Sequence, residues 1–349
     1  MSEPTARRPL AHLELLRIFA AYCVILLHTL APLHNSAANF GTRTWMGVNC
    51  LNEVVRTGVQ IFLMLTGCLL LPAASTKDFS AFYRRRLTRI LVPFFVWDVL
   101  YYVAYRVEAG QPVLSRAFFD ELLNQGSAYH LWYVYTLAGI YLLLPFLARA
   151  LEGCSNRQIF WLVLLAAFPA TIRPFINITT PVYVYLTEPL MEGYLGYVLL
   201  GYWLSRIKLS RATAWAIPLC GISGWLMGMG FNYFRSSAEG LDLYFNGGYT
   251  LNHYLLAAAI FLAARYLRLP DSEKFSRILH KLSGLTYTVY LAHVLVLALL
   301  AHVLPMPTAA LEIAVYPPLC FVLCMALAWG VDWAKAALGR LRPAPAQGR

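Results

Sequence analysis

Long apolar runs alternate with short charged or proline- and glycine-containing breaks along most of the 349-residue chain. A helix needs about 20 apolar residues to cross the roughly 30 Å hydrocarbon layer of a membrane. Ten runs approach that length. They cover residues 12–33, 48–71, 91–107, 131–150, 158–176, 190–205, 212–233, 248–267, 284–304 and 310–334. The pattern therefore predicts an all-α, polytopic integral membrane protein with about ten transmembrane helices.

Composition supports a membrane protein without a separate soluble domain. Hydrophobic residues make up 59% of the chain and charged residues only 13%, which is more apolar surface than one soluble core requires. The loops between the runs are short, so we predict a single transmembrane domain over 1–349 with cytoplasmic tails 1–11 and 335–349. Any chemistry must then occur inside the bundle or at its mouths. The seven cysteines lack metal-ligand spacing, and we expect no metal site.

The 28 Lys and Arg residues are distributed unevenly among the predicted loops. One set of loops, together with both ends of the chain, holds most of them, including the cluster between Arg84 and Arg89. Positive charge is retained on the cytoplasmic side during insertion, so we predict a multi-pass protein of the inner membrane with both termini cytoplasmic. This bias accounts for the net charge of +11. The lipid bilayer is therefore the expected partner of the basic face, and nucleic acid is not.

The first predicted helix carries ionisable residues, which are costly within a membrane and so suggest a function. Arg17 and His28 are eleven residues apart, about three turns plus 20°, and therefore share one helix face. They are separated by about 16 Å along the axis. Glu14 lies three residues before Arg17 and is positioned to neutralise it. An imidazole accepts a proton from a hydroxyl, or carries an acyl group, near neutral pH, so this face is a candidate catalytic track.

Several segments resemble the membrane acyltransferase-3 family, and they follow one another in the family's order. Arg17 and His28 fit its R-x10-H pattern. The other similar segments are GVQIFLMLTGCLLL at 58–71, with Thr66 where serine is usual, FYRRRLTRILVPFF at 82–95, YHLWYV at 129–134 and SGLTYTVYLAH at 283–293. The resemblance extends over most of the chain.

This resemblance implies an O-acetyltransferase that uses acetyl-CoA from the cytoplasm to modify a surface glycan or a lipid-linked sugar. It implies catalytic roles for His28 and Arg17. The basic segment before Pro93 implies a site for the phosphates of the donor, and Arg86, Arg89 and Arg85 are its candidate ligands. A basic linker lying on the inner leaflet is the structural alternative for the same arginines.

Further polar residues in the runs are candidates for substrate binding, and each has a structural alternative. Glu53 and Arg56 are an i, i+3 pair that is placed to neutralise itself. His130 and Trp132 lie where a helix enters from the periplasm, a depth at which tryptophan often serves only as an anchor. Tyr290 and His293 come from the resemblance, and a buried histidine with a satisfied partner is the alternative reading. These six residues form the expected acceptor site.

Two other functional classes remain open from the sequence. Buried charges among ten helices are also typical of a transporter or flippase for a lipid-linked saccharide. A membrane scaffold or receptor would use the same charges only for helix pairing. Within enzymes, another acyl group such as succinyl is an alternative to acetyl.

Overall fold

The computed structural model describes residues 11–73, 78–124, 126–181 and 193–340. Of the predicted tails, residues 1–10 and 341–349 lie outside the described residues, whereas residues 335–340 are part of the last helix. Every regular element within the described ranges is helical. The α-helices are α1 Ala11–His34, α2 Arg43–Val55, α3 Thr57–Leu70, α4 Phe79–Glu108, α5 Ala117–Leu123, α6 Trp132–Ala150, α7 Asn156–Ala167, α8 Arg173–Thr179, α9 Leu195–Arg206, α10 Arg211–Phe234, α11 Leu251–Tyr266, α12 Glu273–Val303 and α13 Ala309–Arg340.

The all-α membrane fold predicted from the sequence is confirmed. Seven helical stretches among the described residues are long and apolar enough to span a membrane: α1, α2 with α3, α4, α6 with the turn before it, α10, α12 and α13. The other three predicted spans coincide with shorter helices, namely α7 with α8, α9, and α11. The start of the predicted span 190–205 lies outside the described residues.

Two predicted helices begin well before their apolar runs. The span predicted at 91–107 is part of α4, which starts at Phe79 because the Asp78 carboxylate accepts a hydrogen bond from Ala81 N at 3.0 Å. The span predicted at 284–304 belongs to α12, which starts after the N-cap Ser272. In both cases about three polar helical turns precede the apolar part, and a search for apolar runs does not detect them.

Two predicted spans are interrupted. The span 48–71 consists of α2 and α3, which meet at Arg56, and its helix starts earlier, at Arg43. The span 158–176 contains a π-helical segment, Phe168–Ile172, which includes Pro169 and separates α7 from α8. Proline removes a backbone donor and clashes with the preceding turn, so such an interruption is expected beside it.

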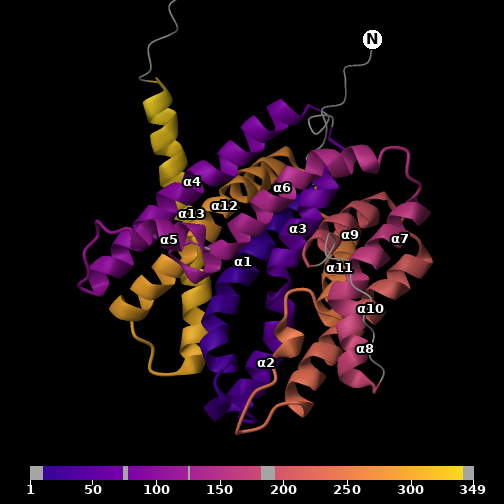
Figure 1. The fold of residues 1–349 in the computed structure, drawn as a ribbon, viewed down its shortest axis with the longest axis horizontal. Helices are drawn as coiled ribbons and strands as arrows, with labels where there is room; N and C mark the ends of the chain where they lie inside the picture. The colour runs from indigo at the N-terminus through magenta and orange to yellow at the C-terminus, as the bar shows by residue number, and fades with distance from the viewer. Residues whose placement is uncertain (1–10, 74–77, 125, 182–192, 341–349) are drawn as a thin grey trace, which may run out of the picture.

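Helix α1 lies at the centre of the bundle, where it packs against α2, α3, α12 and α13. Figure 1 shows the start of α1 and the C-terminal end of α13 toward the same end of the bundle. Helices α3 and α9 approach each other closely because Gly67 faces the Val198 carbonyl and Gly201 faces the Met64 carbonyl. Small residues permit such backbone contact between membrane helices. Gly58 of α3 likewise faces the Ala20 carbonyl of α1, so α3 also packs closely against the helix that carries Arg17 and His28.

Candidate active site

A cavity of about 440 Å³ opens among five helices that are distant in sequence. Helix α1 contributes Arg17 to its wall, and the other walls come from α3, α4, α6 and α12. Its polar and aromatic lining includes Thr66, Arg86, Arg89, Tyr133, Tyr141, Tyr287 and Tyr290. The cavity therefore brings together residues that the sequence analysis selected from the first helix, the basic segment and the tyrosine-histidine segment.

Three arginines give the cavity its charge. Arg86 and Arg89 lie one turn apart on α4, and Arg17 reaches the same space from α1. None of the three forms a salt bridge within the described residues. A neighbouring hollow of about 270 Å³ is lined by Phe82, Arg85, Arg86 and Arg89. These guanidinium groups are thus available to an anionic ligand that contacts both spaces.

Glu14 forms no salt bridge with Arg17 among the described residues, although its charge stabilises the Arg17 guanidinium as the sequence analysis expected. Its carboxylate pairs instead with His280 of α12, with Oε1 at 2.5 Å from Nδ1. The predicted partner was three residues away on the same helix, whereas the observed one is 266 residues away in sequence. Arg17 thus lines the cavity without a salt bridge among the described residues.

A cluster of three histidines lies near the inner end of the cavity. The His28 ring centroid is 5.1 Å from that of His293 and 6.4 Å from that of His130, and the rings of His130 and His293 are 4.8 Å apart. Tyr129 completes the group, because its hydroxyl lies 3.2 Å from His28 Nδ1. His130 and His293 are almost fully buried, whereas His28 is half-buried. His28 is therefore the most accessible imidazole of the cluster.

Tyr290 connects the cavity to this cluster. Its ring lines the cavity, and its hydroxyl donates a hydrogen bond to the backbone carbonyl of His130. The backbone carbonyl of Tyr290 accepts a hydrogen bond from His293 Nδ1 at 2.6 Å. His28 itself does not line the cavity. Tyr290 thus stands at the boundary between the arginine-lined space and the imidazoles.

A family model described as an acyltransferase domain matches residues 10–331 of the chain. The chain belongs to the acyltransferase-3 family. Searches of curated proteins and of solved structures found no match. Because the match covers almost the whole chain, it confirms the enzyme interpretation of the sequence over the transporter and the scaffold, and we describe the protein as a membrane acyltransferase.

Aromatic residues that the sequence analysis did not select also line the cavity of this acyltransferase. Phe62, Tyr141 and Tyr287 belong to its wall, and Tyr287 donates a hydrogen bond to the Ile90 carbonyl at 2.6 Å. On the sequence they are indistinguishable from the other aromatic residues of apolar helices. Trp132 lies beside Tyr194, with ring centroids 5.3 Å apart, and does not line the cavity. Of the residues predicted to bind the acceptor, His130 and His293 belong to the histidine cluster and Tyr290 lines the cavity. Trp132 belongs to neither.

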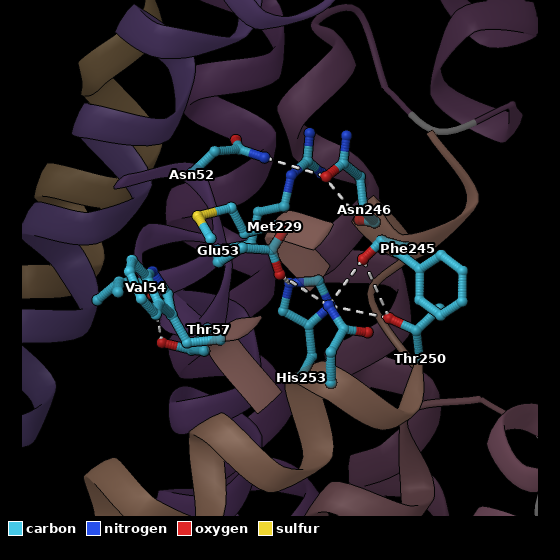
Figure 2. A network of polar contacts seen from close by, with 12 residues as sticks. Asn52, Glu53, Val54, Thr57, Met229, Phe245, Asn246, Thr250 and His253 are labelled. Carbon is cyan, nitrogen blue, oxygen red and sulfur yellow. Dashed lines mark hydrogen bonds and ion pairs between the residues drawn. The ribbon is translucent and has the colours of Figure 1, made fainter. Parts of the chain in front are cut away.

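Glu53 belongs to a buried network between α2, α10, α11 and the segment after α10 (Figure 2). Arg56 contacts the same network. The Glu53 carboxylate accepts hydrogen bonds from Asn232 Nδ2 at 2.9 Å and from Asn252 Nδ2 at 2.7 Å. His253 Nε2 lies 3.7 Å from the same carboxylate. Arg56 donates to the Asn246 carbonyl at 3.0 Å. Glu53 and Arg56 stabilise each other's charge, as the sequence analysis expected, but their hydrogen-bond partners come from other helices and from the segment after α10.

Gly228 of α10 packs directly against this network, and its replacement tests whether the network stabilises the fold. A Cβ there would collide with the Glu53 carboxylate, which cannot retreat without losing the bonds from Asn232 and Asn252. We expect Gly228→Ala to lower the free energy of unfolding by about 2 kcal/mol. The measurement is thermal unfolding of the purified protein in detergent.

Gly230, two residues further along α10, provides the matched control. A Cβ there would meet only Phe234, at 3.9 Å, which is ordinary contact. Gly230→Ala should therefore unfold at the wild-type temperature or slightly above it, since alanine favours the helix. Equal unfolding temperatures for the two variants would show that the Glu53 network adapts without cost.

Proposed function

We propose that this acyltransferase moves an acetyl group from cytoplasmic acetyl-CoA to a hydroxyl of a surface glycan or lipid-linked sugar. One observation carries the proposal. Three arginines that form no salt bridge among the described residues line a cavity that Tyr290 also lines, and Tyr290 contacts the imidazole cluster that contains His28. A phosphorylated donor with a long neutral arm has the shape and charge that such a space accepts.

The donor's phosphates are assigned to the arginines. Arg86 and Arg89 face both the cavity and the neighbouring hollow, which Arg85 also lines. Guanidinium groups bind phosphate oxygens through paired, charge-assisted hydrogen bonds. The pantetheine arm would then extend past Arg17 along the tyrosine-lined wall toward Tyr290. The lysine and arginine bias of the loops supports a cytoplasmic location for this mouth, with both termini on that side of the inner membrane.

The acceptor is assigned to the side of His28 where Tyr129 lies, away from the donor cavity. Tyr129 is 61% exposed and contacts His28, whereas the other two imidazole neighbours are buried. A sugar hydroxyl that arrives past Tyr129 would reach His28 without passing through the donor cavity. Donor and acceptor would in this way meet at one imidazole from two compartments.

The proposed acetyl transfer forms one carbon–oxygen bond and breaks one carbon–sulfur bond. The acceptor oxygen attacks the thioester carbonyl carbon, the carbon–sulfur bond breaks, and the proton of the hydroxyl ends on the sulfur of the departing thiolate. His28 either carries that proton between oxygen and sulfur or accepts the acyl group first as a covalent intermediate. Arg17 is assigned to the donor's negative charge and its orientation.

Acetyl is preferred over succinyl because of a finer resemblance within the family. The segments NEVVRTGVQIFLMLTG and AYHLWYVYTLAGIYLLLPF resemble the enterobacterial common antigen O-acetyltransferase. Both segments contribute to the cavity wall, through Phe62 and Thr66 in the first and Tyr133 and Tyr141 in the second.

The test is O-acetylation of cell-surface glycan, measured by mass spectrometry in cells with and without the protein. We expect one additional acetyl group per modified sugar only in cells that contain it. Binding of acetyl-CoA and succinyl-CoA to the purified protein is measured in parallel. Stronger binding of succinyl-CoA would replace the acetyl assignment, and binding of neither would refute the proposed donor.

A further inference from the structure

His28 makes a single side-chain hydrogen bond among the described residues. Its Nδ1 lies 3.2 Å from the Tyr129 hydroxyl, and the two rings are in edge contact with centroids 5.1 Å apart. An imidazole that acts on a substrate needs its second nitrogen fixed, because that bond sets both the tautomer and the ring orientation. Tyr129 is the residue in position to fix it.

The other imidazoles of the cluster do not form this bond. His293 Nδ1 faces the Tyr290 carbonyl at 2.6 Å and must donate to it, since a carbonyl is only an acceptor. Its Nε2, like both ring nitrogens of His130, is buried and has no hydrogen-bond partner in the part of the chain that the structure describes. These rings pack around His28 but leave its orientation to Tyr129.

The segment that carries Tyr129 is anchored from two helices. The Asp98 carboxylate of α4, which is fully buried, accepts a hydrogen bond from Ser127 N at 2.6 Å. Two residues past Ser127, the Tyr129–Leu131 turn is held by the bond from the Tyr290 hydroxyl to the His130 carbonyl. Gly126 adopts φ +88°, and a Cβ there would meet Asp98 Oδ1 at 3.0 Å. These contacts fix the backbone on both sides of Tyr129.

We propose that Tyr129 is the positioning residue for His28 in acyl transfer, an inference that rests on the function proposed above. For Nε2 to take the proton of the acceptor hydroxyl, Nδ1 must carry the ring hydrogen, and it donates this hydrogen to the Tyr129 oxygen both before and after His28 becomes charged. With Nδ1 held in this way, Nε2 is the nitrogen that meets the reacting groups. Asp98 and Tyr290 act on His28 only indirectly, because they hold the backbone of the segment that contains Tyr129.

The test compares Tyr129→Phe with wild type. Phenylalanine keeps the ring and its packing but removes the hydroxyl. We expect kcat to fall about tenfold, because a misplaced catalytic group costs between one and two orders of magnitude. The Kd of acetyl-CoA and the unfolding temperature should stay at their wild-type values. Tyr249→Phe is the matched control, since Tyr249 is 42% exposed and its hydroxyl makes no hydrogen bond among the described residues; its kcat should not change.

A second readout does not depend on the identity of the donor. Nitrogen NMR of histidine-labelled protein, with the His28 signals assigned by their loss in His28→Gln, reports which ring nitrogen carries the proton. In Tyr129→Phe the His28 signals should move toward a mixture of tautomers while those of His293 stay in place. Unchanged His28 signals, or a kcat equal to wild type, would overturn the positioning role. Lack of acetyl transfer by wild type together with shifted His28 signals would refute the proposed donor and keep the positioning of His28.

Discussion

Replacement of His28 by glutamine is expected to abolish acyl transfer while donor binding is retained. Glutamine is close in size and keeps a hydrogen-bonding end for Tyr129, but it neither accepts a proton near neutral pH nor carries an acyl group. Positioned proton transfer contributes about two to four orders of magnitude to a rate. Turnover of purified His28→Gln should therefore fall at least about 100-fold. The measurement is release of free CoA with acceptor present, beside titration of acetyl-CoA by calorimetry.

His302→Gln is the control for this substitution. His302 is exposed near the end of α12 and makes no side-chain hydrogen bond or ion pair within the described residues, so its loss should leave turnover unchanged. A His28→Gln variant that binds acetyl-CoA and turns over at the wild-type rate would remove His28 from the chemistry. Mass measurement of wild type mixed with acetyl-CoA alone separates the two proposed routes, because only the covalent route adds an acetyl group to His28.

The sequence was sufficient to predict the fold because its signals are local. Apolar length predicts a membrane helix whatever lies beside it, and the R-x2-R spacing places Arg86 and Arg89 on one face of α4 whatever that face meets. That Arg17 lines the same space was also suggested by its polar helix face. The match of an acyltransferase domain to residues 10–331 agrees with the order of the segments noted on the sequence.

The partners of the polar residues were beyond the sequence because they depend on long-range packing. Glu14 pairs with His280 rather than Arg17, and Glu53 is held by Asn232 and Asn252, which are 179 and 199 residues away in sequence. The i, i+3 spacing correctly indicated which charges act on each other, but it carries no information about the hydrogen-bond partners that neighbouring helices supply. For the same reason the role of Asp98 as an anchor of Ser127 was not predictable.

The second large effect is expected at the basic mouth of the cavity. A hydrogen bond to a charged group contributes about 1.5 kcal/mol or more, which is roughly tenfold in Kd. Arg86→Ala and Arg89→Ala should each weaken acetyl-CoA binding about tenfold, and the double variant more strongly. Once the donor saturates the enzyme, kcat should change little, because groups in the proposed phosphate-binding role would bind the ground state and the transition state alike. Calorimetry and the CoA-release assay measure the two effects separately.

Arg84→Ala tests whether acetyl-CoA binding depends on the positions of Arg86 and Arg89 or only on the positive charge of this segment. Arg84 lies on the same helical turn of α4 and carries the same charge, but it lines neither the cavity nor the neighbouring hollow. If Arg86 and Arg89 bind phosphate directly, Arg84→Ala should leave the Kd of acetyl-CoA unchanged, whereas a diffuse basic surface would make the three substitutions equivalent. Salt adds a second criterion, because screening weakens charge pairs. Wild-type affinity should therefore fall as ionic strength rises, and the double variant should lose most of that dependence because the charges responsible for it are gone.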